Sequence, residues 1–372
     1  MSLRDITDFK ARNEWISSET STSLEKVVGA LVDDQARVHC ENLIGAVTIP
    51  LGVAGPLQIR GQHLQKTVYV PLATTEGALV ASISRGCKAI TEAGGAIVAL
   101  EHIGATRGPV FKTSGIEESF KLRAWMESHT EELKQLAAST SSHLKLKNFQ
   151  VQPMGTNVYI RFAYDTGDAM GMNMVTFATE KLVRFIEQET KVECVALAGN
   201  FDIDKKPAWL NSIQGRGRKG WAEVVLTAYN LEKNLKTTAE KLYEIVVRKS
   251  WGGSMMSGSL GFNAHFANVI AAFFAATGQD LAQVGEVSQG ITYAEVRGED
   301  LYFSVYMPDI MIGTVGGGAG LVTQSEARSI MGVTQANEIA EILVAAVLAG
   351  ELSLHGALAE QTLATAHKKL GR

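Results

Sequence analysis

The stretch LKLKNFQVQPMGTNVYIRFAY, residues 144–164, contains two strand patterns joined by a turn. Residues 144–152 and 157–164 are strand candidates, and Pro153-Met154-Gly155 between them is typical of a turn. Amphipathic segments lie on both sides of this pair, at 116–138 and 169–189, with apolar residues at intervals of three and four.

Two further strand-like segments, 110–113 and 193–198, complete the pattern. The order is then β-α-β-β-α-β, which is the ferredoxin-like arrangement. With 372 residues the chain can bury a large core as well. We therefore expect an α+β fold in which a small domain, 109–195, is inserted into a large mixed helical and sheet domain made of 1–108 and 196–372.

Patterns outside the insertion predict the elements of the large domain. Helices are predicted at 76–93, 221–247, 264–278, 337–350 and, less regularly, 351–369, and strands at 67–70 and 302–307.

Composition narrows the class of protein. Hydrophobic residues make up 46% and charged residues 20% of the chain, as in ordinary globular proteins. The net charge of -4 gives no general attraction to nucleic acid or to an anionic membrane, so an anionic ligand needs a local cluster of Lys and Arg. The longest apolar runs, 269–277 and 342–349, are shorter than the roughly 20 residues that span a bilayer. The three cysteines are too scattered for a disulfide framework or a zinc site, so we expect a metal-free protein of a reducing cytoplasm.

Asp204-Lys205-Lys206-Pro207 is the segment with the clearest chemical potential. Two lysines on a Pro-terminated loop can present ammonium groups to a carboxylate or to a developing oxyanion. A solvated surface loop is the commoner explanation of such a pair. Glycine-containing segments on both sides, 197–200 and 215–218, favour a loop that turns tightly or lies against a ligand.

A second candidate is Thr74-Thr75-Glu76-Gly77 with the residues that follow. If Glu76 opens a helix, Ser82, Arg85 and Lys88 lie along one side and form a cationic edge suited to phosphates. The alternative is that Glu76 merely caps the helix. Glu76 could act as an acid only if burial raised the pKa of its carboxyl group.

Two glycine-containing segments are candidates for binding a diphosphate. Residues 167–174 open a predicted helix, with Asp168 as its N-cap and small residues that let a diphosphate approach the free N–H groups. Residues 313–318 would cradle the same ligand or form a tight turn. Neither segment is a G-x-G-x-x-G fingerprint, and no Walker A sequence occurs.

Three side chains have ordinary explanations when each is taken alone. Asp280 fits a solvated carboxylate at a helix end, and His265 fits a packed residue. His367, in a Lys-rich tail, fits an exposed histidine without a role.

Taken together, these segments occur in the order found in one family. The matching segments are 41–45, 52–57, 74–77, 106–109, 168–174, 204–207, 278–280 and 313–318, followed by the tail histidine. On these residues the chain resembles the catalytic portion of 3-hydroxy-3-methylglutaryl-CoA reductases, most closely the class I branch of eukaryotes and archaea. The resemblance extends from about residue 38 to the last residue.

The resemblance implies a four-electron reduction of (S)-3-hydroxy-3-methylglutaryl-CoA to mevalonate and CoA with two NADPH, a step of the mevalonate route to isoprenoids. It implies that Lys205 stabilises the oxyanions of the thioester and of the later aldehyde. It implies that Glu76 donates a proton to the aldehyde oxygen and that Asp280 tunes both groups. His367 would protonate the departing CoA thiolate from a tail that closes over the site.

Binding residues are implied in the same way. Substrate positions are matched by Arg107, Asp204, Lys206, Lys249 and Asn268 for the hydroxymethylglutaryl part and by Ser82, Arg85 and Lys88 for CoA. Dinucleotide positions are matched by Asp168, Met170, Gly171, Met172 and Asn173, with Gly316 and Gly317 as further cofactor candidates. Lys145 and Lys147 lie where class I enzymes place basic residues on the 2′-phosphate, so we expect NADPH rather than NADH.

The family site lies between subunits, so the resemblance implies a homodimer or an assembly of dimers. Ala198 departs from the family, because many class I members have a serine there that contacts the substrate carboxylate, and weaker substrate binding is expected. A nucleic-acid module is disfavoured because 109–195 lacks the RNP aromatic pattern. A catalytically silent CoA binder is disfavoured because all four catalytic positions are retained.

Overall fold

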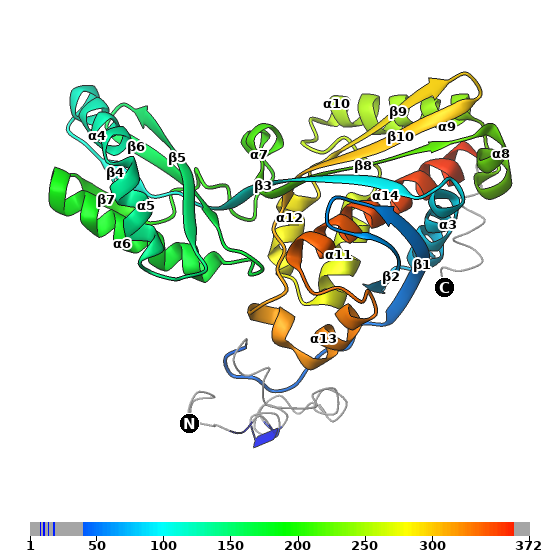
Figure 1. Cartoon of the computed structure of the whole chain (residues 1–372), viewed down its shortest axis with the longest axis horizontal. Coiled ribbons are helices and arrows are strands. Elements are labelled where there is room, and N and C mark those ends of the chain that lie inside the picture. Colours follow the sequence, from blue (N-terminus) through cyan, green and yellow to red (C-terminus); the bar gives the residue numbers. More distant parts are fainter. Residues whose placement is uncertain (1–7, 9, 12–13, 15–17, 19–39, 361–372) are drawn as a thin grey trace.

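The structure is a computed structural model that describes residues 40–360 together with residues 8, 10, 11, 14 and 18. Helices and a largely antiparallel sheet make up a mixed α+β fold, which confirms the predicted class (Figure 1). The buried apolar side chains form two clusters, one for each of two groups of strands. Strand β3 (Ala96–Arg107) connects the two groups.

The first group contains the predicted β-α-β-β-α-β order, with the first helix in two parts. Its elements are β4 (Val110–Lys112), α4 (Ile116–Ser128), α5 (Thr130–Ala138), β5 (Lys145–Met154), β6 (Asn157–Asp165), α6 (Met172–Thr190) and β7 (Glu193–Ala196). The strands lie in the order β7-β4-β6-β5, and each pair is antiparallel. The apolar faces of α4, α5 and α6 pack on this sheet, so the periodicity of the sequence identified the buried faces correctly.

The predicted single helix 116–138 is interrupted at His129. The imidazole stacks on Trp125 with ring centroids 4.2 Å apart, and its Nδ1 lies 2.8 Å from the Trp125 carbonyl oxygen. The backbone of His129 leaves the helical conformation (φ −105°, ψ 19°), although its N–H still donates to the Trp125 carbonyl oxygen at 3.1 Å.

The second group is larger. Its strands are β1 (Leu51–Arg60), β2 (Gln65–Ala73), most of β3, β8 (Arg216–Leu226), β9 (Ile291–Arg297) and β10 (Asp300–Ile310), in the order β3-β8-β10-β9 with the β1–β2 hairpin beside β3. Its helices are α3 (Leu79–Glu92), α7 (Trp209–Gln214), α8 (Ala228–Asn230), α9 (Ala239–Ile245), α10 (Ser254–Ser257), α11 (Phe266–Thr277), α12 (Val284–Val287), α13 (Val322–Ser329) and α14 (Ala336–Ala359). Short helical turns complete it at η3 (Leu231–Leu235), η4 (Val246–Gly253), η5 (Leu281–Gln283) and η6 (Gly317–Gly320).

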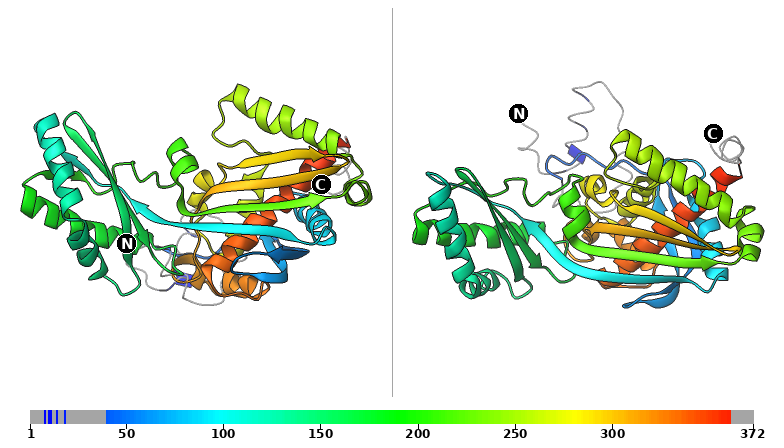
Figure 2. Two further views of the ribbon diagram at one scale, coloured as in Figure 1. Left: turned by 45° about the horizontal axis from the view of Figure 1, so that its top comes forward. Right: turned by 90° about the horizontal axis from the view of Figure 1, so that it is seen from above.

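Helix α14 is the centre of the larger core. It runs along one face of the sheet, as both views of Figure 2 show, and nearly every residue from Ala336 to Ala357 is buried. Its length and composition would also suit a membrane span, but 83% of its most apolar window is buried inside the protein, as expected for a core helix. The helix continues through Gly356 to Ala359, so the helix predicted for 351–369 is confirmed in the part that the structure describes.

Residues 221–247 do not form the predicted helix. Residues 216–226 form strand β8, in which buried and exposed positions largely alternate, and short helical segments follow. Apolar residues such as Val224 and Leu226 occur two apart, which is the spacing of a strand face rather than a helix face. Strand β10 likewise continues through Pro308, where a register shift between Met307 and Asp309 accommodates the proline.

Glu341 of α14 closes the β1–β2 turn from 279 residues away in the sequence. Its wholly buried carboxylate accepts hydrogen bonds from the backbone N–H groups of Gln62, His63 and Leu64 at 2.8, 3.0 and 2.9 Å. Gly61 is required beside it, because an added Cβ would lie 2.0 Å from a carboxylate oxygen.

We expect Glu341→Gln to lower the thermal unfolding midpoint without changing the fold. A glutamine can accept with one oxygen only, so at least one N–H group of the turn loses its acceptor, at a cost of about 1–3 kcal/mol. Differential scanning calorimetry of the purified protein checks this, and an unchanged midpoint would show that water replaces the lost acceptor.

Candidate active site

The loop of residues 204–207 follows a backbone that enters the left-handed region repeatedly. Asn200, Ile203 and Lys205 have φ values of 62°, 55° and 61°. For the β-branched Ile203 this conformation costs on the order of 1–3 kcal/mol and persists only where the surroundings hold it. Asp202 and Ile203 are buried, whereas Lys205 and Lys206 reach the surface.

Lys205 and Asp280 form an ion pair at this surface. The Nζ atom of Lys205 lies 2.8 Å from Oδ2 of Asp280, and both side chains are partly exposed. The other carboxylate oxygen of Asp280 accepts the Ala282 N–H at 3.0 Å and so caps η5. The structure therefore brings together two of the predicted catalytic residues, with the carboxylate held in place by the backbone.

A fully buried guanidinium lies beneath this pair. Arg216, the first residue of β8, donates through Nη2 to Asp204 at 3.1 Å, through Nε to the Thr106 hydroxyl at 2.8 Å, and through Nη1 to Glu286. Removal of a cation from water is costly unless its donors are paired. The hydrogen bond from Arg216 thus fixes the position of the Asp204 carboxylate.

Two carboxyl groups of this cluster, those of Asp309 and Glu286, have pKa values above those of carboxyl groups in water. Burial raises the pKa of Asp309 to about 7, although Arg216 and a 2.6 Å hydrogen bond from Asn211 oppose the shift. Burial and the neighbouring Asp309 raise the pKa of Glu286, again against Arg216. Within the described ranges, no group of three or more His, Cys, Asp or Glu side chains is arranged to hold a metal ion.

Two predicted substrate residues bond to groups of the chain near the loop. The Lys206 ammonium donates to the carbonyl oxygen of Asp204 at 3.0 Å and is exposed. Arg107, at the end of β3, donates to Asp202 at 3.4 Å and to the Thr176 hydroxyl of α6 at 2.8 Å. Arg107 therefore connects the two groups of strands beside the loop.

Among the described residues, no hydrogen bond or ion pair connects the remaining predicted substrate residues, Lys249 and Asn268, with the loop. The backbone N–H of Asn268 donates to the carbonyl oxygen of His265 at 3.0 Å. Burial lowers the pKa of His355, and Lys249 and His265 act in the same direction, which places both near that imidazole.

Glu76 lies apart from this cluster and does not open a helix. Helix α3 begins at Leu79, after Ala78 in the left-handed conformation (φ 70°), and Glu76 is exposed in the turn before it. Among the described residues, no hydrogen bond or ion pair connects Glu76 with Lys205 or Asp280. The predicted catalytic His367 lies outside the described residues, as does the tail beyond residue 360.

The predicted cationic edge of α3 is largely directed into the protein. An added Cβ at Gly86 would lie 1.9 Å from a carbonyl oxygen of α14, so glycine permits a close crossing of the two helices. The crossing brings Ser353 within reach of Ser82, at 2.9 Å, and of the Arg85 guanidinium, at 3.0 Å. Lys88 alone of the three predicted residues is exposed.

A cavity of about 500 Å³ gathers predicted cofactor segments from three parts of the chain. Its lining is made of Ser142, His143, Lys145, Asp165, Thr166, Gly167, Asp168, Ala169, Met174 and Val315. The segments 167–174 and 313–318 touch, because an added Cβ at Gly313 would lie 2.3 Å from the Met170 nitrogen. Gly316 and Gly317 have φ values of 76° and 56°, which glycine adopts readily.

Asp168 does not cap α6 as predicted. Gly171 occupies the N-cap position with φ 87°, and Met172 and exposed Asn173 open the helix. The Asp168 carboxylate instead accepts the Ala336 N–H of α14 at 2.8 Å. It therefore caps a helix that starts 168 residues further along the chain.

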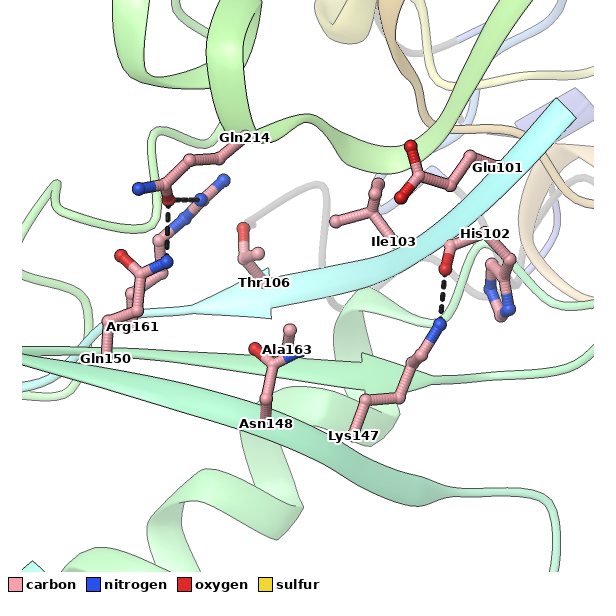
Figure 3. A pocket seen from close by; sticks show the side chains of 10 residues that line it. All are labelled: Glu101, His102, Ile103, Thr106, Lys147, Asn148, Gln150, Arg161, Ala163 and Gln214. Carbon is pink, nitrogen blue, oxygen red and sulfur yellow. Dashed lines mark hydrogen bonds between the residues drawn. The ribbon is translucent and has the colours of Figure 1, made fainter. Parts of the chain in front are cut away.

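Lys145 and Lys147 point to different cavities. In the strand register, Lys145 lies opposite Asp165 of β6, and it lines the 500 Å³ cavity. The register shifts between Leu146 and Asn148, so Lys147 is an extra residue in a bulge and turns the other way. Its ammonium donates to the carbonyl oxygen of His102, as Figure 3 shows. The structure thus separates two lysines that were predicted to act together.

The cavity that Lys147 lines has a volume of about 360 Å³ (Figure 3). Thr106, whose hydroxyl accepts from Arg216, forms part of its wall. Arg161 lies at the opposite end and donates to Gln214 at 2.8 Å. Burial lowers the pKa of Arg161 to about 10.

Sequence reasoning missed the residues that hold the loop. Gln283, Glu286 and Gln289 follow Asp280 at intervals of three, and Arg216 was noticed only as a neighbour of two glycines. The repeated spacing of polar residues in DLAQVGEVSQ, 280–289, was the available signal, because buried polar residues on one side of a helical segment need partners.

Comparisons with known proteins show the family of the chain. The sequence profile described as hydroxymethylglutaryl-coenzyme A reductase matches residues 8–372. The 3-hydroxy-3-methylglutaryl-coenzyme A reductase of Methanothermobacter thermautotrophicus is 49% identical over 98% of this chain and 93% of that protein. The enzyme of the same name from Methanocaldococcus jannaschii is 48% identical over 97% of this chain and 92% of that protein.

The fold is shared with a solved structure as well. The class II 3-hydroxy-3-methylglutaryl-CoA reductase of Streptococcus pneumoniae, solved with NADPH in open conformations, superposes with a TM-score of 0.71 at 20% identity, over 95% of this chain and 97% of that one. The match of the profile over nearly the whole chain, with relatives at almost half identity, establishes the relationship. The chain belongs to the hydroxymethylglutaryl-coenzyme A reductase family.

Proposed function

We propose that the protein reduces (S)-3-hydroxy-3-methylglutaryl-CoA to mevalonate and CoA, consuming two NADPH and two protons. The observation that carries the proposal is the Lys205–Asp280 pair, at 2.8 Å on a strained surface loop, in a chain of this family. Hydride addition to a thioester carbonyl creates an oxyanion, and a fixed cation is what such a step requires most.

Lys205 is the oxyanion donor in this proposal. Its ammonium is exposed enough to meet a substrate, and Asp280 orients it. Arg107, Asp204, Lys206, Lys249 and Asn268 are the proposed contacts of the hydroxymethylglutaryl group, and Ser82, Arg85 and Lys88 those of CoA. Since Ser353 already engages Ser82 and Arg85, exposed Lys88 is the most available of the CoA contacts.

Glu76 and His367 are the proposed proton donors, to the aldehyde oxygen and to the CoA thiolate respectively. Glu76 makes no contact with Lys205 within the described part of one chain, so the proposal requires Glu76 of a second copy. A homodimer, or an assembly of dimers, with its active site between subunits follows. The close archaeal relatives support a cytoplasmic protein.

NADPH fits the 500 Å³ cavity by the character of its lining. Lys145 and His143 offer cationic groups for a 2′-phosphate, while Met170, Gly171, Met172 and Asn173 surround the start of α6, whose free N–H groups suit a diphosphate. Bound there, NADPH supplies the hydride. We propose that residues 109–195 are the domain that binds it and that 1–108 and 196–372 form the domain that binds CoA and substrate.

Lys205→Ala is expected to lower kcat by about 10²–10³-fold, because removal of one oxyanion donor raises the barrier by about 2.7–4 kcal/mol. The measurement is NADPH oxidation with the CoA thioester at saturating concentrations. Lys121→Ala is the matched control, since Lys121 is an exposed lysine paired at 2.7 Å with Glu117 on α4, and its turnover should equal that of the wild type. Near-normal turnover of Lys205→Ala would overturn the assignment.

His367→Gln is expected to impair thioester reduction far more than reduction of added mevaldehyde. Only the first substrate expels a thiolate, whose pKa near that of free cysteine matches an imidazolium donor. The two substrates are compared in the same NADPH assay. Equal losses on both would contradict the role of thiolate acid.

Lys145→Ala is expected to raise KM for NADPH several-fold while KM for NADH stays unchanged, because only NADPH carries the 2′-phosphate. Lys147→Ala removes a lysine of the same strand that faces the other cavity, so it should change neither value. Initial rates with both nucleotides decide this. Equal effects of the two substitutions, or a wild-type kcat/KM higher for NADH, would refute the proposed phosphate site.

A further inference from the structure

The segment 280–289 contacts the catalytic loop with every third residue. Asp280 pairs with the Lys205 ammonium at 2.8 Å, and Gln283 donates to the Asp204 carboxylate at 3.0 Å. The next two contacts are to the backbone. Glu286 accepts the N–H of Lys205 at 2.8 Å, and Gln289 accepts the N–H of Ala208 at 2.7 Å.

The last three of these side chains are rigid because they are buried. Gln283 and Glu286 are completely inaccessible, and Gln289 is 2% exposed. Arg216 holds two of them in place, since its Nη1 donates to Gln283 at 3.2 Å and to Glu286. Gln283 and Glu286 each bond both Arg216 and the loop, so they have few alternative positions. Gln289 is held through its amide oxygen alone, because its Nε2 atom has no hydrogen-bond partner among the described residues.

The loop needs such support. Lys205 has a φ of 61° and Ile203 a φ of 55°, conformations that L-residues other than asparagine and aspartate rarely adopt. Without external hydrogen bonds the backbone would relax toward a negative φ and carry the Lys205 ammonium away from Asp280. The Glu286 carboxylate bonds the N–H of the strained residue itself.

We propose that Gln283, Glu286 and Gln289 form a three-point clamp that positions Lys205 for the reaction, with Glu286 as its central residue. The inference rests on the proposed role of Lys205 as the oxyanion donor. These three residues are positioning residues, because they touch the loop and its supporting arginine, and the loop presents the lysine.

The clamp predicts a kinetic effect with a specific form. A misplacement of about 1 Å at a reacting group costs roughly 10²-fold in rate. Glu286→Gln cannot serve both partners, because its single oxygen can face the Lys205 N–H or Arg216, while its amide N–H groups repel the other. We expect kcat with the CoA thioester to fall at least 30-fold while KM for NADPH remains within twofold, since the cofactor cavity lies elsewhere.

Glu341→Gln is the matched control. It makes the same substitution at another wholly buried glutamate that accepts backbone N–H groups, but in the β1–β2 turn. Its thermal midpoint should fall while its kcat stays within threefold of the wild type. Gln289→Leu provides a second clamp variant, expected to lower kcat about tenfold, and decides the matter if Glu286→Gln does not fold.

The experiment compares the full-length wild type with Glu286→Gln, Gln289→Leu, Glu341→Gln and Lys205→Ala. For each protein it measures the thermal midpoint, kcat, and the KM values for the CoA thioester and for NADPH. Loss of kcat in the two clamp variants but not in Glu341→Gln supports the clamp. Clamp variants within threefold of wild-type kcat, or losses that merely follow the thermal midpoint in all three, overturn it. An active Lys205→Ala would instead refute the proposed function of the lysine, so the two failures are distinguishable.

Discussion

The buried guanidinium of Arg216 is the constraint on which the site depends. Its donors reach Thr106 of β3, Asp204 of the loop 204–207 and Glu286 of α12, three segments that are distant in sequence. Its Nη2 also lies 3.1 Å from the sulfur of Met172, where α6 begins. A cation without access to water can be retained only if these acceptors stay in place, so the charge itself enforces their mutual arrangement.

Strand β3 makes the same region the junction of the two sheets. Residues 97–104 of this strand pair with β8, and residues 105–107 pair with β6. Thr106, which bonds Arg216, and Arg107, which reaches Thr176 of α6, occupy the positions where the strand changes partner. The proposed cofactor-binding part and the catalytic loop are therefore connected through adjacent residues of one strand.

The spacing of apolar residues predicted those helices and strands that bury one regular face. The helix and strand periods between residues 110 and 196 were correct, because each element there buries one regular face. The error at 221–247 arose where a strand face and short helical turns were read as one helix. Asp168 was a plausible cap, but the choice between two helices was made by tertiary packing.

The candidate site divides in the same way. Lys205 and Asp280 were identified from family motifs, whereas Arg216 and Glu286, which support them, were not. Their partnership joins residues 70 positions apart, and neither has a distinctive neighbourhood in the sequence. The position of Glu76 could not be derived from one chain, since the structure leaves it exposed and without a link to the lysine.

The bulge at Lys147 separates two kinds of evolutionary change. Because a strand alternates its faces with a period of two, one inserted or deleted residue here exchanges the side chains that face the two cavities. A length change on β5 would then alter the charge of the 500 Å³ cavity, which is the proposed nucleotide site. Neither Lys205 nor Asp280 lies on this strand, so such a change would leave the residues of the proposed oxyanion site intact.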